Sequence, residues 1–373
     1  MIDLNRRGVV LAAGGALAAS AVGGPLWAQA PEAQQSGRKL GYAVVGLGGY
    51  GLGVIIPQFK HCRHSRLVAL VSGDEAKARR VAQEYGVLDK NLYNYQNFDS
   101  IRDNPDIDIV YVCLPVSMHA EYTIRAAKAG KHVLCEKPMA LSSRECEAMI
   151  AACRQAGKKL MIGYRCHFEP YNLEAIRRAR AGEIGKLRYF RSEHGFNFGN
   201  PNAWRLKKAM SGGGSMMDIG IYALQAARYM TGEEPVAVYA RETTDKSDPR
   251  FREVEDMIEF QLEFPSGVSG SCMSMYSANQ NHILLMGDKG RIELEPGTGY
   301  GGNRLWVGKG RETEITPPNA QANQWAGQLD HMAQCVLENR DPIVPGEEGL
   351  RDIRIIEAVY QSAREKRRIA LKA

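Results

Sequence analysis

Three side chains that can move protons lie in two short stretches of the sequence. Lys137 stands in LCEKPMA, directly after an apolar run, and Asp218 and Tyr222 stand in SGGGSMMDIGIYAL, after a run of glycines. Residues four apart on a helix face the same side, so we expect Asp218 and Tyr222 to project together. A lysine, an aspartate and a tyrosine that converge on a hydroxyl group are suited to proton transfer. The second stretch alone leaves open that Asp218 caps the helix and that Tyr222 packs in the core.

A glycine-rich loop stands nearer the start of the chain. Gly46, Gly48 and Gly51 form a G-x-G-x-x-G motif that directly follows the apolar run LGYAVV and opens a helical pattern. In such a loop the first glycine permits the tight turn, the second lets the backbone approach a pyrophosphate, and the third lets the helix pack on the strand. The alternative is a glycine-rich turn in an unrelated α/β protein. We predict a dinucleotide-binding loop that comprises Gly46, Leu47, Gly48, Gly49, Tyr50 and Gly51.

The end of the second predicted strand favours NADP over NAD. An NAD site usually has a carboxylate about 20 residues after the last glycine, where it binds the ribose 2′-hydroxyl. Ser72 stands at that distance instead, and Lys77 follows on the first turns of a helix. A hydroxyl and a cation suit a 2′-phosphate. Asp74 and Glu75 lie close by, but at the start of a helix we expect them to act as caps.

The elements that must position these residues begin as an alternation of apolar runs and amphipathic helical patterns. This alternation predicts a parallel, doubly wound sheet, in which the carboxyl ends of the strands line the cofactor crevice. Lys137 follows one of these strands, so it should reach the nicotinamide end of a bound dinucleotide. The predicted strands and helices span residues 40–51, 66–73, 74–86, 107–115, 119–130, 132–138, 142–157 and 159–164.

The pattern changes after about residue 163. Longer runs with period-two alternation, separated by turn sequences, predict a mostly antiparallel open sheet. These runs and two closing helical patterns span residues 187–196, 235–244, 256–277, 282–297, 304–310, 323–339 and 347–366. The fold class is therefore α/β, with a Rossmann domain over 40–162 and a C-terminal α+β domain over 163–373. The last helices could pack back on the Rossmann domain.

Composition bounds the function classes. The 373 residues are 44% hydrophobic and 24% charged, which is typical of a soluble globular protein with two domains. The net charge of +6 is spread along the chain and is too weak to indicate nucleic-acid binding. The eight cysteines include no C-x-x-C pair and no cluster with metal-ligand spacing. We therefore expect no metal, and free buried thiols that suit folding in a reducing compartment.

The first thirty residues have the features of an export leader. Arg6 and Arg7 precede a mildly hydrophobic segment rich in Ala and Gly, which ends in the A-x-A cleavage form at Ala30. Twin arginines predict a Tat signal peptide over 1–30, a partnership with the Tat export machinery, and a periplasmic location. A membrane anchor is the alternative.

Two details bear on the fate of this leader. The glycines and Pro25 within the apolar segment disfavour a stable membrane-spanning helix, so we expect no membrane insertion of the mature chain. Pro31 directly follows the cleavage form and leaves open whether and where the leader is removed. A polar linker over 31–39 leads to the first strand.

The chain resembles the Gfo/Idh/MocA oxidoreductases over essentially everything after this linker. The stretches that carry the resemblance are GYAVVGLGGYG, CEKPMA and GGGSMMDIGIYAL. Within the family it is similar to the exported glucose–fructose oxidoreductase group, which includes aldose–aldose oxidoreductases, through VSGDEAKA, YRCHFEPYN, AWRLKKAM, ANQWAGQLDHM and PGEEGLRD. Many family members have His where Tyr222 stands, and Tyr matches this branch.

The resemblance implies roles for individual residues. Lys137 would hydrogen-bond the reacting sugar oxygen, Tyr222 would exchange the proton of the C1 hydroxyl, and Asp218 would orient the sugar and tune Tyr222. The ordinary pKa of a tyrosine is about 10, and we expect the cation of Lys137 to lower it. The implied cofactor contacts are Ser72 and Lys77 at the 2′-phosphate, Tyr95 near the adenine, Leu114, Pro115 and His119 after the fourth strand, Glu136 and Lys137 at the nicotinamide end, and Arg165, Trp204, Arg205 and Tyr300 from the second domain.

The resemblance and the leader together predict a reaction. One aldose loses its C1 hydride to NADP and leaves as an aldonolactone, and a second sugar is then reduced to an alditol in the same site. NADP would stay tightly bound, since no free nicotinamide pool exists outside the cytoplasm, and the kinetics would be ping-pong. The alternatives are a sugar or polyol dehydrogenase that uses free NAD(P), an NAD-dependent glycoside hydrolase of the same fold, and a cofactor-bound sensor without catalysis.

The family resemblance also implies that the domain over 163–373 binds the substrate and that its antiparallel sheet forms the oligomer interface. In glucose–fructose oxidoreductase a long N-terminal arm wraps a neighbouring subunit, whereas the segment 31–39 is short. We therefore expect a homodimer rather than an arm-wrapped tetramer. The preferred sugars depend on loops that the sequence does not place.

Overall fold

Six strands of the first half form a parallel sheet in the computed structural model, which describes residues 37–371. The strand order is β3-β2-β1-β4-β5-β6, and every neighbouring pair runs parallel. This is the order of a doubly wound dinucleotide-binding sheet. The parallel, doubly wound sheet is as predicted, although β3 was not among the predicted strands. The strands are β1 (Leu40–Val45), β2 (Ser65–Val71), β3 (Leu92–Tyr93), β4 (Ile109–Val112), β5 (His132–Glu136) and β6 (Leu160–Gly163). The predicted leader over 1–30 lies outside the described residues.

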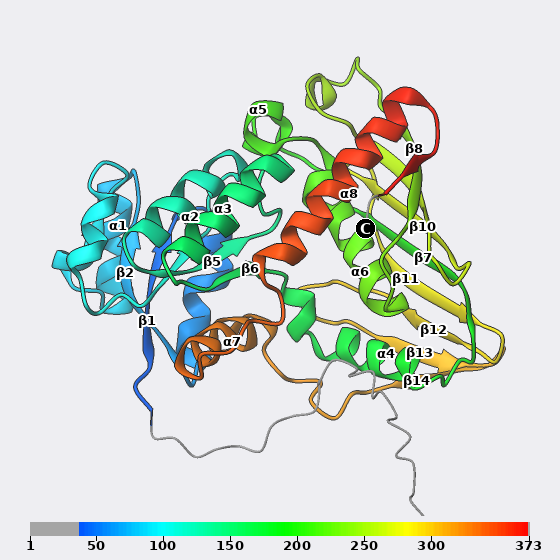
Figure 1. Cartoon of the computed structure of the whole chain (residues 1–373), viewed down its shortest axis with the longest axis horizontal. Helices are drawn as coiled ribbons and strands as arrows, with labels where there is room; N and C mark the ends of the chain where they lie inside the picture. The colour runs from blue at the N-terminus through cyan, green and yellow to red at the C-terminus, as the bar shows by residue number, and fades with distance from the viewer. Residues whose placement is uncertain (1–36, 372–373) are drawn as a thin grey trace, which may run out of the picture. The chain divides into compact units, whose positions relative to one another are not determined.

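Both faces of this sheet are covered, which explains the continuous apolar runs. Val110 and Val112 of β4 pack with Ala126 of one helix and Met149 of another, and the alternating residue Tyr111 belongs to a second cluster with Leu329. Figure 1 shows two of the covering helices side by side next to β5 and β6. The covering helices are α1 (Glu75–Tyr85), α2 (His119–Lys128), α3 (Ser143–Gln155) and α7 (Gln324–Leu337).

The helix that follows the glycine loop is irregular. A π-helical turn, η1 (Gly51–Ile55), leads into a 3₁₀ helix, η2 (Ile56–His61), instead of the regular helix that the motif predicts. Pro57 stands in the first turn of η2 and has no N–H to donate, which disfavours continued α-helical bonding there. The further 3₁₀ turns are η3 (Asp89–Asn91), η4 (Phe98–Asp103), η5 (Val116–Met118), η6 (Arg165–Phe168), η7 (Trp204–Leu206) and η9 (Pro249–Phe251).

Nine strands of the second half form an open, mixed sheet. The order is β14-β13-β12-β11-β7-β10-β9-β8-β15, and only the β7–β10 pair of these neighbours runs parallel. The mostly antiparallel sheet is as predicted, although β14 and β15 were not among the predicted strands. The strands are β7 (Leu187–Gly195), β8 (Ala237–Thr243), β9 (Met257–Glu263), β10 (Ser269–Met275), β11 (Gln280–Gly287), β12 (Arg291–Leu294), β13 (Leu305–Gly308), β14 (Glu312–Ile315) and β15 (Ile369–Ala370).

Helices lie against this second sheet (Figure 1). The alternation in β7 buries Phe190, Ser192 and His194, and the buried residue Ala223 of a covering helix contacts the sheet, where its carbonyl accepts from Cys272 Sγ of β10. These helices are α4 (Pro170–Arg180), the π-helical turn η8 (Met216–Gly220), α6 (Ile221–Thr231) and α8 (Gly346–Glu365). The short helix α5 (Lys208–Ser211) lies beside η5 and η7 instead.

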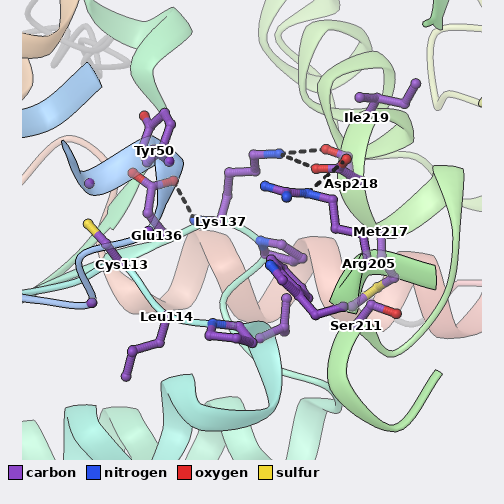
Figure 2. A pocket seen from close by; sticks show the side chains of 18 of the residues that line it. Tyr50, Cys113, Leu114, Glu136, Lys137, Arg205, Ser211, Met217, Asp218 and Ile219 are labelled. Carbon is purple, nitrogen blue, oxygen red and sulfur yellow. Dashed lines mark hydrogen bonds and ion pairs between the residues drawn. The ribbon is translucent and has the colours of Figure 1, made fainter. Parts of the chain in front are cut away.

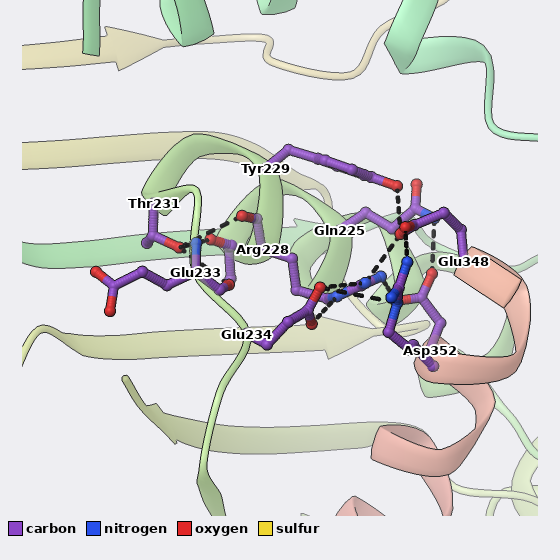
Figure 3. Close-up of polar contacts among 10 residues, drawn as sticks. Gln225, Arg228, Tyr229, Thr231, Glu233, Glu234, Glu348 and Asp352 are labelled. Atoms are coloured by element: carbon purple, nitrogen blue, oxygen red, sulfur yellow. Dashed lines mark hydrogen bonds and ion pairs between the residues drawn. The ribbon is translucent and has the colours of Figure 1, made fainter. Parts of the chain in front are cut away.

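A buried arginine joins two of these helices. Arg228 of α6 is 1% exposed and donates to Asp352 of α8 at 2.6 Å, to Glu234 at 2.7 Å and to Glu348 at 2.9 Å (Figure 3). The charge of Asp352, which is fully buried, is therefore matched inside the protein. This network keeps α6, which carries Tyr222, in place against α8.

All eight cysteines lie within the described residues and are unpaired, and six of them are buried. This agrees with the expectation of free thiols. Between residues 37 and 371, no helix has both the length and the apolar character needed to cross a membrane.

Candidate active site

A cavity of about 810 Å³ lies where the carboxyl ends of the parallel strands meet the second domain. Each residue predicted from the sequence as catalytic or cofactor-binding lines it, from the glycine loop to Tyr300. The structure thus brings the whole predicted set into one place, while the individual roles remain predictions. Figure 2 shows Glu136 and Lys137 on one side of the cavity and Arg205 and Asp218 on the other.

The glycine loop leaves room for a pyrophosphate. Gly46 has a φ of +98°, and a Cβ there would lie 2.4 Å from the carbonyl oxygen of Cys113. A Cβ on Gly51 would lie 2.5 Å from the carbonyl oxygen of Gly46. In contrast, a Cβ on Gly48 or Gly49 would meet no atom within 4 Å. The first and third glycines are therefore required by the chain's own packing, and the second keeps the cavity side of the loop open, so the loop fits a dinucleotide.

The predicted 2′-phosphate contacts lie together at the end of β2. Ser72 Oγ accepts a hydrogen bond of 3.0 Å from the backbone N–H of Asp74. The Asp74 carboxylate caps α1 by accepting from the N–H of Lys77 at 2.9 Å, and it lies 3.5 Å from the ammonium of Lys77. Asp74 acts as a helix cap, as predicted. The aromatic ring of Tyr95 packs against Gly73 on the same side of the cavity.

Two buried acid–base groups stabilise the loops after β4 and β5. The ring nitrogens of His119 lie 2.9 Å from the carbonyl oxygen of Pro138 and 2.8 Å from that of Leu114, so His119 bridges the two loops. Glu136 accepts a very short hydrogen bond from Tyr111 and a bond of 3.2 Å from the N–H of Lys137. Burial raises the pKa of Glu136.

Lys137 and Asp218 form an ion pair across the cavity (Figure 2). Lys137 Nζ donates to the backbone oxygen of Asp218 at 2.5 Å and to its Oδ1 at 3.3 Å. The other carboxylate oxygen accepts from the hydroxyl of Tyr276 at 3.0 Å and lies 3.3 Å from Nε of Arg205. Burial alone would raise the pKa of Asp218, but the charges of Lys137 and Arg205 outweigh burial and hold it below its ordinary value. The carboxylate makes no helix-capping bond, which excludes the capping alternative.

Tyr222 lies beside this pair without a hydrogen bond to it. The ammonium of Lys137 lies 4.7 Å from the centroid of the Tyr222 ring, whereas the Tyr222 hydroxyl accepts a hydrogen bond of 3.2 Å from Nε of Arg165. Burial raises the pKa of Tyr222 to about 12, and Arg165 is the cation that opposes this shift most strongly. The prediction that the pKa of Tyr222 is lowered is therefore wrong for this arrangement. The reason is that burial outweighs the cation of Arg165, and the ammonium of Lys137 is paired with Asp218.

The remaining predicted residues form an aromatic and cationic rim. The guanidinium of Arg205 stacks on Trp204 at 4.6 Å from the ring centroid. Tyr300, which is 54% exposed, stacks on Arg165 at 4.7 Å and lies 6.5 Å from the ring of Tyr50. Tyr300 and Tyr50 belong to the second domain and the glycine loop respectively, so this contact spans the cavity.

Several lining residues were missed by the sequence analysis. The ring of His194 lies 6.2 Å from that of Tyr222, and its nitrogens contact Ser192 at 2.9 Å and Thr298 at 3.2 Å. Asn281 accepts from the hydroxyl of Thr298 at 3.1 Å. Polar residues at the buried positions of an alternating strand were the available signal for His194, but alternation does not say which strand end meets a cavity.

The comparisons with known proteins agree with this geometry. The Gfo/Idh/MocA model described as an oxidoreductase family with an NAD-binding Rossmann fold matches residues 40–164. The model described as the C-terminal alpha/beta domain of that oxidoreductase family matches residues 177–371. The chain belongs to the Gfo/Idh/MocA oxidoreductase family. The family resemblance drawn from the sequence motifs is thereby confirmed.

Relatives within the family are similar over most of their length. The crystal structure of aldose-aldose oxidoreductase from Caulobacter crescentus, complexed with glycerol, is 53% identical, has a TM-score of 0.88, and covers 90% of this chain and 100% of its own. D-xylose 1-dehydrogenase [NADP(+)] from Haloarcula marismortui is 31% identical over 88% of this chain and 92% of its own. scyllo-Inositol 2-dehydrogenase (NAD(+)) from Bacillus subtilis is 28% identical over 81% and 87%.

One group of possible metal ligands lies outside the cavity. Ligand atoms of His282, Glu293 and Glu295 lie within 4.8 Å of one another. His282 is bonded to Glu293 at 2.8 Å, and Arg291 lies 3.6 Å from the same carboxylate. Arg291 already offsets the negative charge of Glu293, so the group is a polar cluster on the second sheet.

Proposed function

We propose that the chain is a sugar oxidoreductase that oxidises an aldose at C1 to the aldonolactone and reduces a second sugar to the alditol in the same site. The observation that carries the proposal is the placement of the Lys137–Asp218 pair and Tyr222 in one cavity with the glycine loop. The 53% identity to an aldose-aldose oxidoreductase supports a sugar as the substrate. The proposed reaction needs one group that can take a proton from a hydroxyl and later return it.

Lys137 and Tyr222 would have different roles in this reaction. Lys137 would hold the reacting oxygen, since its ammonium lies between the carboxylate of Asp218 and the ring of Tyr222. In the oxidative half-reaction the O–H bond of the sugar breaks and its proton passes to Oη of Tyr222. In the reductive half-reaction the same oxygen returns a proton to the carbonyl oxygen of the second sugar.

NADP is the proposed cofactor. When bound along the glycine loop it would supply the hydride acceptor for the first sugar and the hydride donor for the second. Ser72 and Lys77 would hold the 2′-phosphate, since a hydroxyl and an ammonium line the cavity where a carboxylate specific for NAD would otherwise stand. The NADP(+) specificity of the xylose dehydrogenase relative supports this choice. We propose that the cofactor is retained between turnovers, which makes the kinetics ping-pong.

Export is part of the proposal. Arg6 and Arg7 would direct the chain to the Tat machinery, which carries folded proteins to the periplasm, so NADP could be loaded before export. A retained cofactor then has to be regenerated by a second substrate in the same site. We propose a homodimer as the assembly.

Product analysis tests this function. The full chain is incubated with xylose or glucose alone, with no nucleotide added, and the products are identified by NMR. The proposal predicts aldonate and alditol in equal amounts, because each hydride taken from one sugar reaches another. The similarity to a xylose dehydrogenase favours one rival, a dehydrogenase that uses free NADP. That rival predicts no product until NADP⁺ is supplied, and then aldonate without alditol.

A further inference from the structure

Arg165 is a buried cation whose partners are all neutral. The residue is 3% exposed. Its Nη1 donates to Gln324 Oε1 at 2.8 Å and to the backbone oxygen of Gly299 at 3.3 Å, and its Nη2 donates to the backbone oxygen of Thr298 at 2.5 Å. Its Nε donates to the hydroxyl of Tyr222 at 3.2 Å. Among residues 37–371 no carboxylate forms an ion pair with Arg165, and the acidic groups that act on it are tyrosines and a cysteine.

The other buried arginine described above, Arg228, has carboxylate partners, in contrast to Arg165. Arg228 is matched by the carboxylates of Asp352, Glu234 and Glu348 (Figure 3). A buried charge without a counterion is unfavourable, and an anion that forms next to it is correspondingly stabilised. Within the part of the chain that the structure describes, the hydroxyl of Tyr222 is the only titratable group that Arg165 hydrogen-bonds.

Lys137 is less suited to this role. Its charge is already balanced by Asp218, and its ammonium faces the Tyr222 ring rather than the oxygen. The other titratable or charged groups around Tyr222 do not supply a free cation at the hydroxyl. They are Glu136 and Tyr50 on the Rossmann side, Cys166 and His167 from η6, His194 from β7, Tyr229 from α6, and Tyr300.

We infer that Arg165 is a positioning residue that stabilises the phenolate of Tyr222 and thereby prepares Tyr222 to accept the proton of the substrate hydroxyl. This rests on the proposed function of Tyr222. In oxidation the sugar O–H bond breaks, the proton forms the O–H bond of Tyr222, and the C1 hydride leaves to the nicotinamide. Arg165 keeps its protons throughout. Gln324 of α7 and the backbone oxygens of Thr298 and Gly299 hold the guanidinium plane so that Nε remains directed at the hydroxyl.

Two variants at two different residues test this inference. Arg165→Met removes the cation. Gln324→Glu keeps Arg165 but supplies the missing carboxylate counterion in a side chain of nearly the same shape. Arg205→Met is the matched control, because Arg205 lies in the same cavity but pairs with Asp218 instead of Tyr222.

Two readouts are measured for each protein. The ultraviolet absorbance of tyrosinate is followed during a pH titration, and subtraction of the Tyr222→Phe curve isolates Tyr222. The rate of the oxidative half-reaction is followed by single-turnover kinetics across pH. For Arg165→Met and Gln324→Glu we expect the pKa of Tyr222 to rise further, so that its tyrosinate absorbance and the rate at about pH 10 to 11 both fall about tenfold. The rate near neutral pH then falls about tenfold for each unit by which this pKa rises.

The outcomes test the role of Arg165 and the proposed function separately. A lowered rate with the tyrosinate absorbance of Tyr222 unchanged would overturn the role of Arg165. An equal upward shift in Arg205→Met would also overturn it, because the effect would then belong to the cavity's total charge. If Arg165→Met does not fold, Gln324→Glu still decides. Full activity of Tyr222→Phe would refute the proposed function itself. This result can be told apart from a failure of the role of Arg165, which leaves Tyr222→Phe inactive.

Discussion

The ammonium of Lys137 bridges two oxygens of Asp218, the backbone carbonyl at 2.5 Å and Oδ1 at 3.3 Å. The two residues are 81 positions apart: Lys137 directly follows the Rossmann strand β5, and Asp218 lies in the helical turn η8 that precedes α6. The contact joins the two walls of the cavity and places a positive charge next to the ring of Tyr222. The ammonium of Lys137 therefore already donates to Asp218, and a bound substrate has to share this donor with Asp218.

Lys137→Met should lower kcat by about 10²- to 10⁴-fold, because it removes the donor proposed for the reacting oxygen. The bound nucleotide should remain, since the glycine loop is untouched. Steady-state kinetics and the nucleotide content of the purified protein measure the two effects. Lys137→Arg keeps the charge and serves as the control for loss of the ion pair. A kcat unchanged in Lys137→Met would contradict the assignment.

Tyr222→Phe should abolish turnover while leaving the nucleotide bound, because the ring that packs beneath Lys137 is kept and only the hydroxyl is lost. Tyr222→His should retain part of the activity with an optimum at lower pH, since a histidine titrates at about 6.5. The comparison of the two variants in pH–rate profiles tests the proton role. Equal inactivity of both at all pH values would count against it.

Asp218 should make the protein's stability depend on pH in the acid range. Its folded pKa is held below the ordinary value of 3.8 by Lys137 and Arg205, which outweigh the burial that would raise it. The stabilising contribution is therefore complete above the unfolded pKa and is lost as the pH falls through the folded one. Thermal unfolding midpoints between about pH 5 and pH 2 should fall less steeply for Asp218→Asn than for the natural chain. Parallel curves would show that Asp218 makes no such contribution.

Gly48→Ala should weaken nucleotide binding without unfolding the protein. A Cβ at this position meets no protein atom within 4 Å and extends into open space at the loop. Gly53→Ala is the matched control, because its Cβ is equally unobstructed but Gly53 is not among the residues that line the cavity. Nucleotide released on denaturation and the circular dichroism spectrum give the two readouts. Full nucleotide content in Gly48→Ala would place the pyrophosphate elsewhere.

Arg228→Met should destabilise the fold by about 3–5 kcal/mol, because it leaves the buried carboxylate of Asp352 without its cation. Arg354→Met is the control, since the Arg354–Glu147 pair is more than half exposed on both sides and should contribute less than about 1 kcal/mol. Urea unfolding followed by circular dichroism measures both. Similar midpoints for the two variants would show that the network is not a stabilising core.

The sequence predicted the regular elements well and the irregular ones poorly. Helices with clear caps and apolar stripes, such as α1 and α3, lie within a residue or two of their predicted bounds. The strand β14 was not predicted because it is short and largely polar or charged, and β3 and β15 were not predicted because each has only two residues. The π-helical turns η1 and η8 leave no periodic trace in so few residues.

At the site, the motifs predicted which residues lie together but not which hydrogen bonds and ion pairs they form. The glycine loop, Lys137 and Tyr222 could be placed from motifs and family resemblance, since strand ends of a doubly wound sheet converge. The ion pair of Lys137 with Asp218 depends on side-chain directions that arise only when the two domains meet, and the hydrogen bond of Tyr222 with Arg165 depends on a contact between η6 and α6 within the second domain. His194 was missed for the same reason, because its role follows from the end of β7 facing the cavity.

The spectrum of the purified full chain tests the central claim most directly. The protein is isolated without added nucleotide, and its ultraviolet absorbance is recorded while glucose is added. We predict that reduced nicotinamide appears in a stoichiometric amount and disappears when a second sugar is added. A protein that is isolated without nucleotide and turns over only with free NADP⁺ would contradict the account.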